Sequence, residues 1–241
     1  MFEELWDLSK SITSHTLDAQ MVWPNCTMPH FDILAGERKP QTKIPFRDPP
    51  GEFVGFAPFV TPETRPGWES YSVENQGWIA QDYEYRGSPW NETTPAPIPP
   101  AIHGYNGTEY QDYEGEMFDY MIPLWQVSPV RQDTSIINLD LATIPMMAHL
   151  LWDVKVKKVE QYSRVMKYET LALFLGEENV DEKDHPKGTI FQPVFEDFRE
   201  DSEVVGFMIA SLSWDDVFSG VVFEGGASLL VEIEGTVRTY I

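Results

Sequence analysis

The chain has only one cysteine, Cys26, among its 241 residues. A single thiol excludes an internal disulfide framework and any C-x-x-C motif. The G-x-S-x-G, Walker and H-E-x-x-H motifs are absent as well. The histidines are scattered without metal-ligand spacing, at His15, His30, His103, His149 and His185. The sequence therefore predicts no catalytic residue, no metal site and no cofactor.

Long hydrophobic runs are also missing. No stretch reaches the roughly 18 consecutive apolar residues that a membrane-spanning helix needs, so no span is expected within this chain. The opening residues, MFEELWDLSK, are acidic and amphipathic, unlike the start of a secretory signal peptide.

Cations are scarce. Lys and Arg number 17 against 39 Asp and Glu, which gives a formal charge of −22. Such a charge argues against nucleic acid or anionic lipid as a partner. Apolar residues make up 42% of the chain and include 8 Trp, enough to bury a core, so global disorder is not expected.

The most informative stretch is WESYSVENQGWIAQD, residues 68–82. Wound as one helix, it places Trp68, Tyr71, Asn75, Trp78 and Asp82 within about 100° of one another. The run before it, EFVGFAPFV at residues 52–60, has the composition and length of a buried strand. The simplest interpretation of the aromatic face is core packing, with the amide making a structural hydrogen bond.

The same stretch resembles the extracellular sensor region, of CHASE or Cache type, in protist receptor-type adenylyl and guanylyl cyclases. The resemblance rests on W-E-x-Y-S-V-x-N-Q-G-W-I following A-P-F-V, and on three further motifs in the same order. These are WPNCTMPHFDI at 23–33, PLWQVSP at 123–129, and QPVFEDF followed by VVGFMIASLSWDDVF within 192–218. The resemblance implies a sensor between two membrane helices, with the cyclase chemistry in a separate cytoplasmic domain.

From these patterns we expect an α+β fold, CHASE-like, with a long N-terminal helix and two PAS-like lobes of mixed or antiparallel sheet flanked by helices. Residues 1–22 form the stalk-like helix and 23–144 the first lobe, with a Pro/Gly/acidic insertion at 83–116. Residues 145–186 form a connecting helix and an acidic loop. Residues 187–241 form the smaller second lobe, ending in a hairpin across Glu234-Gly235. A short strand is expected near Phe31 to Leu34.

The expected N-terminal helix carries an apolar stripe diluted by Ser9, Thr13 and Thr16. Such a stripe is typical of a helix that lies along a neighbour or of a loosely packed dimer seam. The resemblance favours a homodimer through this helix, with membrane contact only through flanking segments outside this chain.

The resulting hypothesis is a non-catalytic, extracellular, ligand-sensing ectodomain. Its pocket for an unknown small molecule would be lined by Trp68, Tyr71, Asn75, Trp78 and Trp125. Three N-glycosylation sequons, at Asn25, Asn91 and Asn106, agree with an extracellular location.

Two alternatives remain open. The first is a secreted carbohydrate-binding or carbohydrate-active protein that uses the Trp/Tyr/acid-rich loop at 83–120, with Glu114 and Glu116 as the acids to test. The second is a structural dimerisation ectodomain without a small ligand.

Overall fold

A computed structural model describes residues 2–37, 53–85, 97–106, 110–112, 119–130, 133–162, 187–213, 229–233 and 236–240. Several predictions lie outside these residues. They are the acidic loop at 177–184 and about half of the insertion at 83–116.

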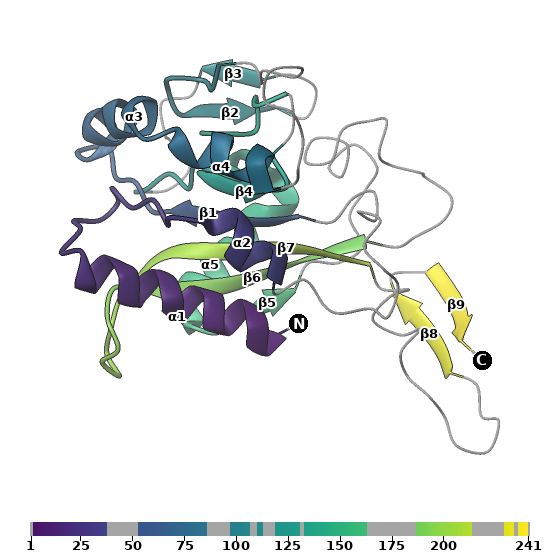
Figure 1. Ribbon diagram of the computed structural model, residues 1–241. Coiled ribbons are helices and arrows are strands. Elements are labelled where there is room, and N and C mark those ends of the chain that lie inside the picture. The colour runs from purple at the N-terminus through teal and green to yellow at the C-terminus, as the bar shows by residue number, and fades with distance from the viewer. Residues whose placement is uncertain are drawn as a thin grey trace.

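A five-stranded antiparallel sheet forms the centre of the molecule, in the order β4-β1-β7-β6-β5 (Figure 1). The α+β class, with helices and antiparallel sheet, is confirmed. The strands are β1 (Val54–Pro58), β4 (Gln126–Ser128), β5 (Gln161–Tyr162), β6 (Lys187–Phe195) and β7 (Val204–Ser213).

This sheet corrects the expectation that each predicted lobe has a sheet of its own. β1 comes from the first predicted lobe and β7 from the second, yet the two are hydrogen-bonded neighbours, with Phe56 opposite Met208. Both strands are rich in buried apolar residues, and two such strands bury more surface side by side than apart. The predicted boundary at residue 187 therefore divides one sheet.

Helices cover both faces of this sheet. Phe56 and Met208 share the face of Trp23, whose ring lies 6.2 Å from that of Phe56. The neighbouring Phe207 points to the opposite face, because side chains alternate along a strand. The helices are α1 (Phe2–Asp18), α2 (Phe31–Glu37), α3 (Arg65–Glu74), α4 (Gly77–Tyr85) and α5 (Pro145–Lys157), with the short 3-10 helix η1 (Leu141–Thr143) before α5.

Helix α1 lies along β6 and β7, in front of the sheet in Figure 1. The Ser9 hydroxyl donates to the Pro193 carbonyl at 2.6 Å, and the Thr13 hydroxyl donates to the Phe195 carbonyl at 2.8 Å. Two of the three hydroxyls that dilute the apolar stripe therefore bind a strand of the same chain, whereas the Thr16 hydroxyl donates to carbonyl groups of its own helix. The helix ends at Asp18, earlier than the predicted residue 22.

The segment around Phe31 is helix α2, so the prediction of a strand there was wrong. As a helix it buries Phe31 and Ala35, which are four residues apart, on one side. The amphipathic period of this short segment was too brief to distinguish the two structures from sequence.

Residues 68–82 are two helices rather than the one predicted. Asn75 ends α3 with non-helical backbone angles, φ −112° and ψ 38°, and α4 begins at Gly77. The Asn75 backbone N–H and its side-chain amide both donate to the Tyr71 carbonyl, so the side chain occupies an acceptor at the helix end.

Two smaller sheets complete the described structure. Strands β2 (His103–Tyr105) and β3 (Tyr110–Asp112) pair with each other, as do β8 (Leu229–Ile233) and β9 (Thr236–Tyr240). The hairpin predicted across Glu234-Gly235 is confirmed by the β8–β9 pairing, in which Ile233 lies opposite Thr236.

The close approach of β1 and β7 requires glycine at position 206. A Cβ built there would lie 2.8 Å from the Ala57 carbonyl oxygen and 3.0 Å from Pro58 Cα, both backbone atoms that cannot move aside. We expect Gly206→Ala to lower the free energy of unfolding by about 1–3 kcal/mol through overpacking. The measurement is urea unfolding followed by circular dichroism.

Gly67→Ala is the matched control. Gly67 lies in α3, and a Cβ added to it would meet no other atom within 4 Å. Alanine there should leave the free energy of unfolding unchanged or raise it by about 0.4–1 kcal/mol, since alanine favours a helix over glycine. Equal losses in the two variants would contradict the close strand approach.

Candidate functional site

Four of the five side chains predicted to line a pocket come together. Trp125, just ahead of β4, lies at the centre of the group and is fully buried. Its ring centroid is 5.3 Å from that of Trp68, 6.2 Å from Tyr71 and 5.7 Å from Trp78. We call these four residues the aromatic cluster. It joins α3 and α4 to the edge of the sheet.

Asn75 does not belong to the aromatic cluster. As the residue that ends α3, it is half-buried and bonded to its own helix. Its predicted place in the stripe assumed a continuous helix, and the break after Glu74 removes that assumption. The two tryptophans on either side of the break both contact the Trp125 ring.

Thr27 supplies the polar centre of the cluster. Its hydroxyl oxygen accepts hydrogen bonds from the Tyr71 hydroxyl at 2.7 Å and from Trp125 Nε1 at 3.0 Å. Burial raises the pKa of Tyr71, so this phenol stays protonated and remains a donor. In the sequence Thr27 stood out only as the third residue of a sequon, and nothing local indicated this role.

A second polar contact comes from Asn138, which is fully buried. Its side-chain oxygen accepts from Trp68 Nε1 at 3.2 Å, and its amide nitrogen donates to Ser72 Oγ and to the Pro99 carbonyl. Its φ of 61° is in the left-handed region, which asparagine tolerates better than most residues. An asparagine within the apolar run IINL was the available signal, and sequence reasoning missed it.

The carboxylate of Asp82, on α4, is buried and serves the structure. It accepts from Ser128 Oγ at 2.6 Å and from the Val130 backbone N–H at 2.9 Å. Gln126 acts in a similar way: its amide bonds both backbone groups of Met28, at 2.7 and 3.0 Å. At the β4 edge of the sheet, these side chains therefore bind the backbone groups of Met28 and Val130.

Among the residues that the structure describes, two buried polar atoms on α2 and α4 have no hydrogen-bond partner. They are Trp78 Nε1, a donor, and Asp32 Oδ1, an acceptor on α2, and both residues are buried. Burial raises the pKa of Asp32, and the neighbouring charge of Asp82 raises it further. Helices α2 and α4 contact each other. A buried donor on α4 and a buried acceptor on α2 are therefore left for a group from outside the described residues to bind.

The described residues include no group of three or more His, Cys, Asp or Glu side chains that could hold a metal ion. Burial raises the pKa of the Cys26 thiol to about 12, so the reactive thiolate is disfavoured. Trp68, Trp78 and Trp125 are at most 3% exposed, so the cluster packs as part of the core, around a few fixed donors and acceptors.

The three sequons differ in their surroundings. Asn25 is half-buried with its side-chain oxygen buried, Cys26 is fully buried, and Thr27 is bonded within the aromatic cluster. Asn106 is exposed at the end of β2. Asn91, Glu114 and Glu116 lie outside the described residues.

Within the part of the chain that the structure describes, no helix is both long and apolar enough to cross a membrane. No protein-family model matches the chain, and no curated protein matches it.

The Thr27 contacts give a direct test of the cluster. Thr27→Val keeps the side-chain shape but removes the acceptor, leaving Trp125 Nε1 buried without its partner. We expect the free energy of unfolding to fall by about 1–3 kcal/mol. Thr27→Ser keeps the oxygen and should cost no more than about 0.8 kcal/mol, the value of one buried methyl-sized group. Chemical denaturation of protein made in bacteria, without glycans, measures both. Equal effects of the two variants would show that the hydroxyl is not what matters.

Proposed function

We propose that this chain is the ligand-sensing ectodomain of a receptor-type nucleotide cyclase, related to CHASE and Cache sensors, and that it does not itself catalyse a reaction. The observation that carries the proposal is the strand order of the central sheet. Numbered within that sheet alone, from β1 as first to β7 as fifth, the strands lie in the order 2-1-5-4-3. PAS-like domains have this order.

The position of the helices supports the same proposal. Helices α3 and α4 lie between the first and second strands of the sheet in sequence, and α5 precedes the third. A PAS-like sensor binds its ligand between such helices and the sheet, where the aromatic cluster lies. A fold of this kind hosts many ligands, so the side chains at the site determine which one binds. We propose one PAS-like unit built from both ends of the chain in place of the two lobes expected.

The contacts of α1 suggest how a signal could leave the domain. Its Ser9 and Thr13 hydroxyls bind carbonyl groups of β6, so a shift of the sheet would move the helix with it. A homodimer through α1 would use the part of the helix that the sheet does not cover, where Leu17 is exposed, because Leu8 and Ile12 are buried. Membrane attachment through flanking segments completes this proposal.

A ligand screen tests the sensing function. We expect at least one small polar metabolite or organic cation to raise the melting temperature of the purified domain. At a concentration of 100 times its Kd, such a ligand adds about 2.7 kcal/mol of stability. Failure of a broad metabolite panel to shift the melting temperature would count against a sensor.

A variant pair locates the ligand. Trp78→Phe removes the unpaired indole N–H and keeps an aromatic ring, so a ligand that accepts from this group loses much of its shift. Trp152→Phe, at an exposed position on α5, is the control and should retain the full shift. Retention of the full shift by Trp78→Phe would place the ligand elsewhere.

Glycosylation tests the proposed extracellular location. In protein secreted from a glycosylating host, we expect Asn106→Gln to remove one glycan from the intact mass. Asn25→Gln should leave the glycan mass unchanged, because the Asn25 side-chain oxygen and Cys26 are buried. A glycan on Asn25 would contradict the packing around Thr27.

The carbohydrate-binding alternative has one observation in its favour. Tyr105 and Tyr110 on the β2–β3 hairpin have ring centroids 5.8 Å apart, and Tyr110 is exposed. Aromatic pairs of this kind can contact sugar rings. Binding to a glycan array that is abolished by Tyr110→Ala would favour this alternative over the sensor.

A further inference from the structure

Asp140 is a buried carboxyl group at the junction of three parts of the chain. Its Oδ1 atom accepts from the Ile122 N–H at 2.9 Å and from the Ala142 N–H at 3.0 Å, at the start of η1. Its backbone N–H donates to the His103 carbonyl of β2 at 2.8 Å. The residue therefore ties η1 and β2 to the chain that leads into β4.

The second carboxyl oxygen is different. Asp140 Oδ2 is buried and has no hydrogen-bond partner in the described part of the chain, and the residue has no exposed surface. An ionised carboxylate needs donors at both oxygens, and a buried charge that lacks them is costly. Nothing in the sensor proposal uses this group.

The surrounding charges compensate for this only in part. The Arg65 guanidinium of α3 is the cation that favours ionisation of Asp140. Arg65 also bonds Glu69 at 2.7 Å and the Ile102 carbonyl at 3.0 Å, so its charge is shared. Tyr120 is also a titratable neighbour: burial raises the pKa of Tyr120, and the charges of Asp119 and Asp140 raise it further. From β2, the His103 ring contacts carbonyl groups of Ser135 and Ala101 instead. The neighbouring η1 brings only Leu141, Ala142 and Thr143, none of them charged.

We propose that the Asp140 carboxyl is a proton-binding site that makes the junction of η1, β2 and the β4 segment respond to mildly acidic conditions. Protonation removes the uncompensated charge from the interior while Oδ1 keeps both backbone donors. Burial raises the pKa of Asp140 from its ordinary value of 3.8 to about 6, although the Ile122 and Ala142 N–H groups oppose the rise.

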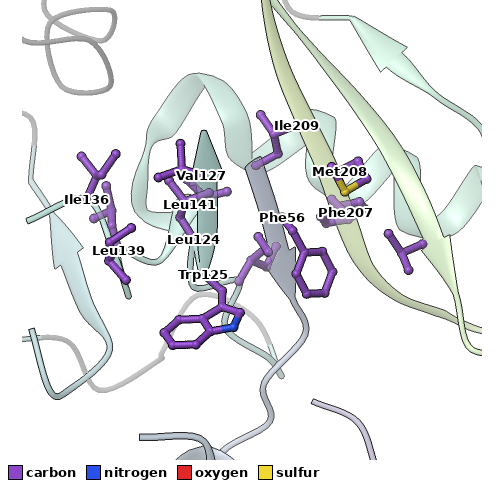
Figure 2. Close-up of a cluster of buried hydrophobic side chains, with 14 of the residues drawn as sticks. Phe56, Leu124, Trp125, Val127, Ile136, Leu139, Leu141, Phe207, Met208 and Ile209 are labelled. Carbon is purple, nitrogen blue, oxygen red and sulfur yellow. The ribbon is translucent and has the colours of Figure 1, made fainter. Parts of the chain in front are cut away.

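The junction also reaches the aromatic cluster. Asn138, two residues before Asp140, holds Trp68 Nε1, and Figure 2 shows Leu139 and Leu141 in the same group of buried side chains as Leu124 and Trp125. Proton uptake at Asp140 therefore acts on the segment that positions Trp68.

The sign of the effect follows from the two pKa values. The folded protein keeps the Asp140 proton to a higher pH than the unfolded chain, so this contribution to stability is fully present below the ordinary pKa and is lost as pH rises through about 6. Between pH 5 and pH 7.5 the loss amounts to about a tenfold fall in the folding equilibrium constant.

The experiment is urea unfolding of the full chain at pH 5 and pH 7.5, a range that stays above the pI near 4.4. Asp140→Asn keeps an oxygen for the two backbone donors and cannot titrate. In this variant, the roughly tenfold fall in the folding equilibrium constant that Asp140 contributes between pH 5 and pH 7.5 should be absent. Glu84→Gln, which removes one exposed charge, is the control for general repulsion among carboxylates, and Asp32 is present in both variants. This control should keep the wild-type dependence. An Asp140→Asn variant with the wild-type pH dependence would overturn the proposal.

A second measurement covers the case in which Asp140→Asn does not fold. In the wild-type protein, the ¹³C resonance of the Asp140 carboxyl carbon, assigned through the backbone, is followed against pH. A midpoint near 6 supports the proposal, and a midpoint near 4 overturns it.

Discussion

The antiparallel pairing of β1 with β7 is the contact on which the rest of the structure depends. It joins residues about 150 positions apart in sequence, with Val54 opposite Ala210 and Pro58 opposite Gly206. β1 also pairs with β4 on its other edge, so it connects the edge strand β4 to β7 and the rest of the sheet. Glycine at 55 and at 206 allows the neighbouring backbone and Leu124 to approach closely.

Polar side chains hold the elements around this sheet where strands do not. Gln126 bonds both backbone groups of Met28, and the Arg65–Glu69 pair does the same for Ile102. Asn138 and Asp140 join α3, β2 and η1 to the chain before β4. The bonds of Gln126 to Met28, Glu69 to Ile102, Asp140 to Ile122 and Asn138 to Pro99 all join residues at least 18 positions apart in sequence. Because buried polar groups require partners, these bonds restrict how the helices can lie on the sheet.

The aromatic cluster and the Asp140 junction are neighbours in this network. One offers ring surface with an unpaired indole donor, and the other offers a carboxyl group with an unpaired oxygen. A domain that senses a ligand needs an element whose free energy responds to what binds, and both features provide unused interaction capacity inside the fold. Their common link is Asn138, which contacts Trp68 through its side chain and β2 through its backbone carbonyl.

The sequence by itself determined the α+β class, the strand β1, the start of α5 at Pro145, and the final hairpin, because hydrophobic period, Pro and Gly signals act locally. It also placed Trp68, Tyr71, Trp78 and Trp125 at one site, since buried aromatic residues collect in the core. Only the tertiary structure decided that one sheet uses both ends of the chain, that Asn75 ends a helix, and that Thr27, Asn138 and Asp140 are the polar partners. Those outcomes depend on contacts between residues far apart in sequence, which local patterns do not specify.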